Sequence, residues 1–179
     1  MRKILLLVTF LLIFFNLFVF SVNAQSSYVL PYPSSMPGSS FYRLHLLEEL
    51  ILKYWYYGDF GQFTYSLKES DKYLVEAKTL FEYKQYLLGY KALEKSNKYF
   101  LNTMPNLLSA REHGKDIKDK IVILSEASKK HQEELVILEK ELPQNFVWSP
   151  EKAASQNLPI SKLILESIKL REKYEKTNI

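Results

Sequence analysis

Residues 60–81 read FGQFTYSLKESDKYLVEAKTLF, and small or apolar side chains recur in this stretch at alternating steps of three and four. The positions that follow this rule are Phe60, Phe63, Leu67, Ser70, Leu74, Ala77 and Phe81. On an α-helix, such an alternation places all of these side chains on one stripe, called a seam, that can pair with a second helix. The stretch therefore predicts a long helix packed along its length against other helices.

Two further seams follow in the sequence. The first consists of Tyr86, Tyr90, Leu93, Asn97, Phe100, Met104 and Leu107. The second consists of Ile117, Ile121, Leu124, Ser128, His131, Leu135, Leu138 and Leu142. Lys84-Gln85 and His113-Gly114 mark short turns between the seams, and Pro105 is expected to kink or split the middle helix. Three consecutive seams joined by short turns predict an antiparallel bundle.

Shorter helices are expected on both sides of this bundle. A first helix is expected over residues 40–56, with Ser39 or Ser40 as its N-cap. Its inward-facing residues are expected to be Leu44, Leu47, Ile51 and Tyr54. A last amphipathic helix is expected over residues 160–176.

Between them, Ser149-Pro150-Glu151 has the form of a helix start, with serine as N-cap and proline at the first helical position. Pro159 would interrupt the helix that follows. No segment alternates as a half-buried strand does. We therefore predict an all-α fold: an antiparallel up-down bundle of four to five helices with an extended N-terminal proline arm.

The N-terminus has the pattern of a secretory signal peptide. Arg2 and Lys3 are basic, residues 4–20 are almost wholly apolar, and Val22-Asn23-Ala24 resembles a cleavage site. The apolar run is about as long as the shortest membrane-spanning helices, so an uncleaved anchor remains the alternative. Either outcome predicts an extracytoplasmic protein, secreted or anchored at the outer face of the cytoplasmic membrane.

The chain is accordingly divided into four segments. They are a signal peptide (1–24), an extended arm (25–40), a helical bundle (41–142) and C-terminal helices packed on the bundle (143–179). The chain has 24 Lys and Arg against 20 Asp and Glu, in mixed order, so no stripe suited to nucleic acid is apparent. It has 0 Cys, so packing and not disulfides must hold the domain.

The arm contains Leu30-Pro31-Tyr32-Pro33, which must be extended because each proline fixes its own φ and restricts the residue before it. We expect Leu30, Tyr32 and Met36 to cover a groove of the bundle, because apolar side chains are usually buried.

The stretch LPYPSSMPGSSFYRL at residues 30–44, followed by LKESDKYLVEAKTLFEYKQYLLGYKALEKSNKYF at residues 67–100, resembles an uncharacterised family of bacterial proteins. Its members are secreted or membrane-anchored, and carry an L-P-Y-P-G-x-x-P-D-like motif before a helical domain of unknown function. The resemblance spans residues 30–142. It implies an extracytoplasmic helical domain and supplies no catalytic residues.

No catalytic or metal-binding motif is visible in the sequence. The residues three positions before His45, His113 and His131 are tyrosine, alanine and serine, so the Glu-x-x-His motif of di-iron bundles is absent. The chain also lacks the G-x-S-x-G motif and a glycine-rich phosphate loop. We therefore expect neither an enzyme, a cofactor nor a metal site.

One candidate binding site is an aromatic corner formed by Trp55, Tyr56, Tyr57 and Phe60. Four successive helical residues, starting from Tyr54, sweep about 300° around the helix, so they cannot all face one core. The corner is interpreted as half-buried packing, and the alternative is an aromatic platform for a glycan, a peptide or a membrane surface.

A second candidate is a polar layer of Ser70, Asn97 and His131, which interrupt the three seams. Ser70 and Asn97 lie 14 and 12 residues from the turn at residues 84–85, and Asn97 and His131 each lie 17 residues from Gly114. At 1.5 Å per residue, these side chains should meet within about 3 Å of one height. A register-setting layer is the interpretation, and a pocket for a small molecule or metal is the alternative.

Together these features predict an extracytoplasmic structural or protein-interaction module of the bacterial cell envelope. Its partner would be an unknown envelope protein or cell-wall component, and membrane association is expected only if the N-terminal segment stays uncleaved. The alternative is a binding domain for a small molecule or cell-wall fragment, using the aromatic corner or the polar layer. Fold class alone does not decide between these functions.

Overall fold

The computed structural model describes residues 26–33, 37, 42–152 and 154–176, without the side chains at positions 42, 43, 45 and 46. The predicted signal peptide, the expected caps Ser39 and Ser40, and Met36 lie outside the described residues. The elements are α2 (Tyr42–Trp55), α3 (Gly58–Glu82), α4 (Tyr86–Leu101), α5 (Thr103–Glu112), α6 (Lys118–Glu141), β1 (Phe146–Trp148), β2 (Gln156–Leu158) and α7 (Ile160–Glu175).

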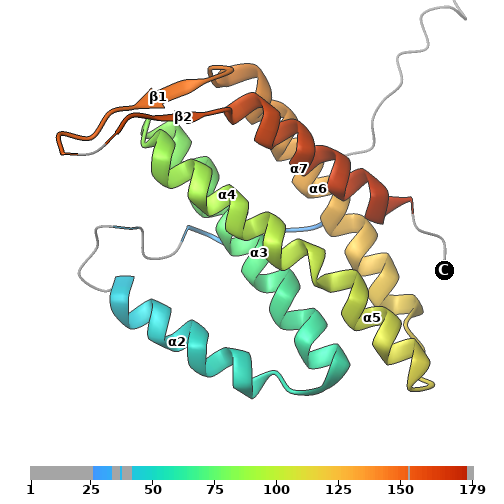
Figure 1. Cartoon of the computed structure of the whole chain (residues 1–179). Coiled ribbons are helices and arrows are strands. Elements are labelled where there is room, and N and C mark those ends of the chain that lie inside the picture. Colours follow the sequence, from blue (N-terminus) through green and yellow to red (C-terminus); the bar gives the residue numbers. More distant parts are fainter. Residues whose placement is uncertain (1–25, 34–36, 38–41, 153, 177–179) are drawn as a thin grey trace, which may run out of the picture.

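The predicted all-α antiparallel bundle is confirmed. α3 packs along α4, and α6 packs along α7, while α5 continues the course of α4 beside the first half of α3 (Figure 1). α2 lies at the edge of the molecule and contacts α3. The described part of the arm crosses the α3 and α6 side of the bundle.

Local chemistry explains where these helices end. The α3–α4 turn closes with the Gln85 amide donating to the Leu80 carbonyl oxygen at 2.8 Å. The α5–α6 turn closes in the same way, with the Lys115 amide donating to the Ala110 carbonyl oxygen at 3.0 Å. Gly114 has φ +75° there, a conformation that glycine adopts at little cost.

The expected effect of Pro105 is also present. α4 ends at Leu101 and α5 begins at Thr103, so the proline lies in the first turn of α5. Its missing N–H is tolerated there, because the first amides of a helix have no intrahelical partner.

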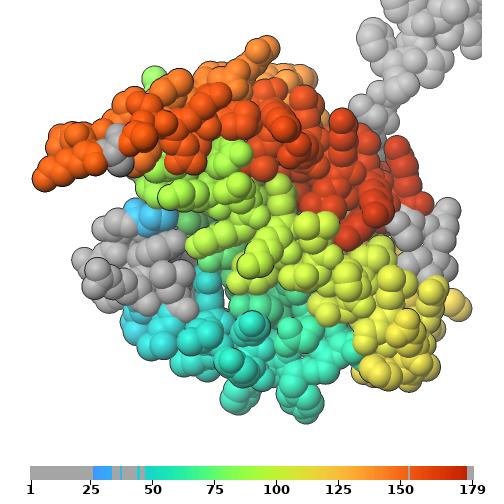
Figure 2. Space-filling model, viewed as in Figure 1, coloured from blue at the N-terminus to red at the C-terminus, as the bar shows by residue number. Residues whose placement is uncertain are grey.

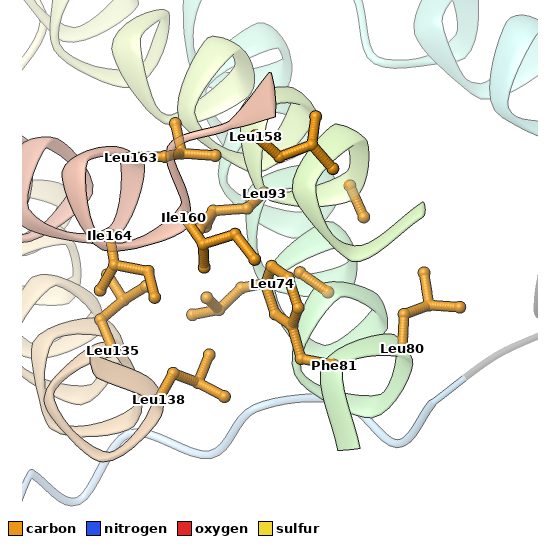
Figure 3. Packing of buried hydrophobic residues seen from close by; sticks show 12 residues of the cluster. Leu74, Leu80, Phe81, Leu93, Leu135, Leu138, Leu158, Ile160, Leu163 and Ile164 are labelled. Carbon is orange, nitrogen blue, oxygen red and sulfur yellow. The ribbon is translucent and has the colours of Figure 1, made fainter. Parts of the chain in front are cut away.

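Two apolar clusters form the core of the described part. The cluster nearer the hairpin consists of Leu74, Ala77, Leu80, Phe81, Ala92, Leu93, Leu135, Leu138, Leu158, Ile160, Leu163 and Ile164 (Figure 3). The second consists of Phe63, Leu67, Phe100, Met104, Leu107, Leu124, Ala127 and Tyr174. On each of the four long helices, buried polar residues separate the members of one cluster from the members of the other.

The region between α6 and α7 corrects the sequence prediction. Ser149-Pro150-Glu151 does not start a helix: β1 and β2 pair antiparallel, with Phe146 opposite Leu158 and Trp148 opposite Gln156. A helix from residue 150 would end at Pro159 after little more than two turns, which is short for an isolated helix. The hairpin instead buries Leu158 in the core and packs Phe146 against Tyr86, with ring centroids 4.6 Å apart.

The orientation of α2 is the second correction. Leu44, Leu47, Ile51 and Tyr54 were expected to face the core, but they are 62%, 53%, 58% and 75% exposed. Among the described side chains of α2, the buried one is Glu49, which is 8% exposed. α2 therefore turns a polar residue inward and an apolar stripe outward.

Candidate functional site

The polar layer is organised around Arg171 of α7, whose side chain is completely buried. Its Nε donates to Nδ1 of His131 at 3.2 Å, and its Nη2 donates to Oγ of Ser96 at 3.0 Å. Nη1 donates to Oδ1 of Asn97 and to the carbonyl oxygen of Ser167. One guanidinium thus binds α6, α4 and the preceding turn of its own helix.

The bond from Arg171 fixes the protonation of His131. An arginine Nε can only donate, so Nδ1 of His131 must carry a free lone pair. The histidine is therefore neutral, with its proton on Nε2, which donates to Oδ1 of Asp71 at 2.7 Å. Asp71 of α3 thereby becomes the negative group that faces Arg171 across the imidazole ring.

Burial is the main effect on the charges of the layer. It lowers the pKa of Arg171 to about 9, and the nearby Asp71 carboxylate opposes this change. Arginine nevertheless stays charged at neutral pH. The Phe100 ring lies below the guanidinium, with the Arg171 carbon 4.7 Å from the ring centroid, and adds a cation–π contact.

Of the predicted layer residues, Ser70 and His131 are fully buried and Asn97 is half-buried. None of the hydrogen bonds among the described residues joins two of the three directly. Asn97 and His131 both accept hydrogen bonds from Arg171. Ser70 is linked to this layer through Ser96, since the Oγ atoms of the two serines lie 3.3 Å apart.

The sequence analysis missed the residues that connect this layer: Asp71, Ser96, Ser167 and Arg171. A signal for two of them was available in α7, where Ser167 and Arg171 occupy the buried face between Ile164 and Tyr174. The alternative of a ligand pocket within the layer is not favoured. Arg171 and His131 are 0% exposed and their polar atoms are engaged with the protein, so neither can reach a ligand.

The arm joins this layer at its outer end. The Tyr28 hydroxyl donates to Oδ2 of Asp71 at 2.6 Å, so both oxygens of that carboxylate are bound. The Ser26 amide donates to Glu133 at 2.7 Å, and the Ser26 hydroxyl donates to the Glu126 carbonyl oxygen at 2.8 Å. These bonds tie the start of the arm to α3 and α6.

The proline motif contributes less than expected. Leu30 is half-buried against the core cluster nearer the hairpin. Pro31 and Pro33 are exposed, and Tyr32 is 95% exposed, so the expectation that Tyr32 covers a groove is wrong. The docking of the described arm therefore depends on Ser26, Tyr28 and Leu30.

The aromatic corner is divided between buried and exposed rings. Trp55 and Tyr57 are 77% and 87% exposed, whereas Tyr56 and Phe60 are half-buried. Tyr56 packs against Tyr65 with ring centroids 6.1 Å apart. The four residues therefore do not form one shared platform.

The exposed part of the corner instead continues an apolar surface of α2, which we name the α2 stripe. It consists of Leu44, Leu47, Leu50, Ile51, Tyr54 and Trp55, all more than half exposed. At 100° per residue these six side chains occupy an arc of about 140°. Space-filling atoms show α2 at the periphery of the bundle beside α3 (Figure 2).

Polar contacts hold the opposite face of α2 to the bundle. Glu49 accepts a hydrogen bond from the Tyr73 hydroxyl at 2.8 Å and forms an ion pair with Lys72. The Lys72 ammonium also lies 3.5 Å from Oε2 of Glu69, whose carboxyl pKa burial raises to about 7. The Tyr65 hydroxyl donates to the Glu49 carbonyl oxygen at 3.3 Å. A charged and hydrogen-bonded contact thus holds α2 with the α2 stripe facing solvent.

No group of three or more His, Asp or Glu side chains in the described ranges has the arrangement of a metal site. Among the helices of those same ranges, none has both the length and the hydropathy needed to cross a bilayer. Comparison of the chain with protein-family models, with curated proteins and with solved structures gave no match. The resemblance to the family with the L-P-Y-P-G-x-x-P-D-like motif therefore stays a prediction.

Replacing Tyr28 with Phe tests whether the arm is held by the polar layer. The change removes the donor to a largely buried carboxylate, so the free energy of unfolding should fall by about 1–2 kcal/mol. Limited proteolysis within residues 28–33 should become faster. Tyr32→Phe is the matched control, because that ring is 95% exposed and should change neither measurement. Equal behaviour of the two variants would contradict the role of Tyr28.

The neutral state of His131 predicts a dependence of stability on pH. Burial lowers the pKa of His131 most, Arg171 lowers it further, and Asp71 and Glu134 oppose the change. Below about pH 6.5 the unfolded chain therefore binds more protons at this position than the folded protein, so acidification destabilises the fold. Glu69 has the opposite effect, because its raised pKa makes its contribution to stability decline as pH rises towards 7.

Urea unfolding of the wild type and of His131→Gln at several pH values separates these effects, because Glu69 is present in both proteins. The stability advantage of the wild type should shrink as pH falls below about 6.5, by at most about 1.4 kcal/mol per pH unit. An advantage that stays constant down to about pH 5 would show that His131 is not held neutral.

Proposed function

We propose that the protein is a non-catalytic protein-interaction module of the bacterial cell envelope, and that the α2 stripe docks a helix of a partner protein. The extracytoplasmic location rests on the signal-peptide pattern of residues 1–24. The docking role rests on the exposure of the stripe.

The orientation of α2 is the observation that carries the proposal. A surface helix normally turns its apolar stripe to the core and its charged face to solvent. α2 does the reverse, with Glu49 buried and the α2 stripe exposed. Contiguous exposed apolar surface of this kind marks interaction sites in soluble proteins.

The spacing of the stripe indicates what binds there. Leu44, Leu47, Ile51 and Tyr54 follow steps of three, four and three, which is the a/d spacing of a coiled-coil seam. An amphipathic helix laid along α2 would bury these side chains, with the Trp55 ring at one end of the contact. Trp and Tyr are also the residues that most often dominate such interfaces.

Site-specific photo-crosslinking tests the proposal in cells that express the protein. A photoreactive residue at position 47 should give a discrete protein adduct, and Ile51→Glu in the same chain should abolish it. A photoreactive residue at position 122 is the control, because Val122 is 62% exposed on α6 and outside the stripe. Ile51→Glu should change the free energy of unfolding by no more than about 0.5 kcal/mol, because the side chain is exposed.

If position 47 formed adducts with lipid alone, the α2 stripe would bind a membrane surface and not the proposed partner helix. The same protein adducts from positions 47 and 122, or none from position 47, would contradict docking at the α2 stripe.

A further inference from the structure

A second surface feature lies beside α2 and does not involve the stripe. A cavity of about 380 Å³ opens between α2, α3 and α4. Tyr65, Tyr73 and Tyr99 are among its lining residues. The Tyr99 ring stacks on Tyr73 at 5.7 Å and 4° between planes, and Tyr65 meets it edge-on at 5.9 Å and 84°. Tyr65 and Tyr73 are buried in this packing, and Tyr99 is the half-buried ring of the three.

Three lysines from two helices surround the same cavity. Lys53 of α2 and Lys95 and Lys98 of α4 line it, and all three are exposed. Among the ion pairs between described residues, none involves any of these three ammonium groups. The ammonium nitrogen of Lys95 instead lies 4.7 Å from the centroid of the Tyr73 ring, which is a cation–π contact.

The one carboxylate on the cavity wall is already neutralised. Glu49 lines the cavity, but it forms an ion pair with Lys72 and accepts a hydrogen bond from Tyr73. The cavity therefore presents an excess of positive charge next to aromatic surface. Asn102 adds a side-chain amide, and Gln62 adds a side-chain carbonyl oxygen that can accept, because its amide nitrogen already donates to the carbonyl oxygens of Lys53 and Tyr56.

The fold explains only part of this arrangement. Lys53 and Lys98 lie in the last turns of α2 and α4, where a cation interacts favourably with the helix dipole. Lys95 lies outside the last turn, where it contacts the Tyr73 ring and is attracted by the Glu69 carboxylate. Three like charges around one opening still repel one another. A bound anion would remove that repulsion.

We infer that this cavity binds an anionic saccharide, with an apolar face of the sugar against the half-buried Tyr99 ring and its carboxylate or phosphate group at Lys95 and Lys98. The Tyr99 ring gives such a ligand an apolar contact, and charge-assisted hydrogen bonds hold its acidic group. A small number of placed polar groups on a largely apolar wall is typical of ligand pockets. Acidic polysaccharides of a cell wall have this chemistry in either form, carboxylate or phosphate.

Titration of the folded chain without residues 1–24, followed by calorimetry and NMR, tests the inference. The probes are oligogalacturonate for the carboxylate form, oligo(glycosyl phosphate) for the phosphate form, and maltotetraose as the neutral saccharide. We expect one of the two acidic probes to bind and maltotetraose to bind at least about tenfold more weakly. Lys95→Gln with Lys98→Gln should weaken binding of the acidic probe by at least about tenfold, because each lost charge-assisted bond contributes on that scale. Tyr99→Leu should also weaken it.

The matched control is Lys162→Gln with Lys169→Gln, which removes the same charge from exposed positions on α7 and should leave binding unchanged. Equal losses in the two double variants would show non-specific attraction to a basic protein and overturn the site, as would the absence of binding by both acidic probes. Ile51→Glu should leave saccharide binding intact, so failure of the α2 stripe and failure of this cavity are separate results.

Discussion

The burial of one guanidinium is the constraint on which the bundle depends. Arg171 is removed from water, so each of its donors must find an acceptor inside the protein. The acceptors come from α4, α6 and α7, and the compensating carboxylate Asp71 comes from α3. A shift of any of these helices by one turn would leave a buried charge or donor without a partner, which costs several kcal/mol. The polar layer thereby fixes the register of the four helices.

Buried polar groups also hold the arm and α2 in place at the surface of the bundle. Tyr28 completes the hydrogen bonds of Asp71, so the N-terminal segment is attached by the group that balances Arg171. α2 is attached through Glu49, which binds Lys72 and Tyr73 of α3. Because these polar contacts lie on the opposite face of the helix, the α2 stripe is free to face outward. The buried polar contact of Glu49 and the exposed α2 stripe are therefore two consequences of the same orientation of α2.

The sequence predicted the parts of the fold that depend on spacing and turns. Seam periodicity predicted the long helices, and equal distances from two short turns placed Asn97 and His131 at one height. Arg171 could not be placed in that layer, because a helix was expected to start at Ser149-Pro150-Glu151, whereas this segment joins the two strands of a hairpin. The orientation of α2 could not be derived from spacing either, since a seam defines a stripe and not the side on which its partner lies. Glu49, on the opposite face of that helix, was the residue whose burial decided it.

The tautomer of His131 is the most direct test of the buried network, because it follows from Arg171 being a donor at that position. Long-range ¹H–¹⁵N correlation spectra of the imidazole ring at neutral pH report the protonation of each nitrogen separately. The network predicts a neutral ring with Nε2 protonated and Nδ1 unprotonated, and Arg171→Met should release this preference. A ring with both nitrogens protonated, or with the proton on Nδ1, would contradict the hydrogen bond from Arg171 and with it the register that the polar layer imposes.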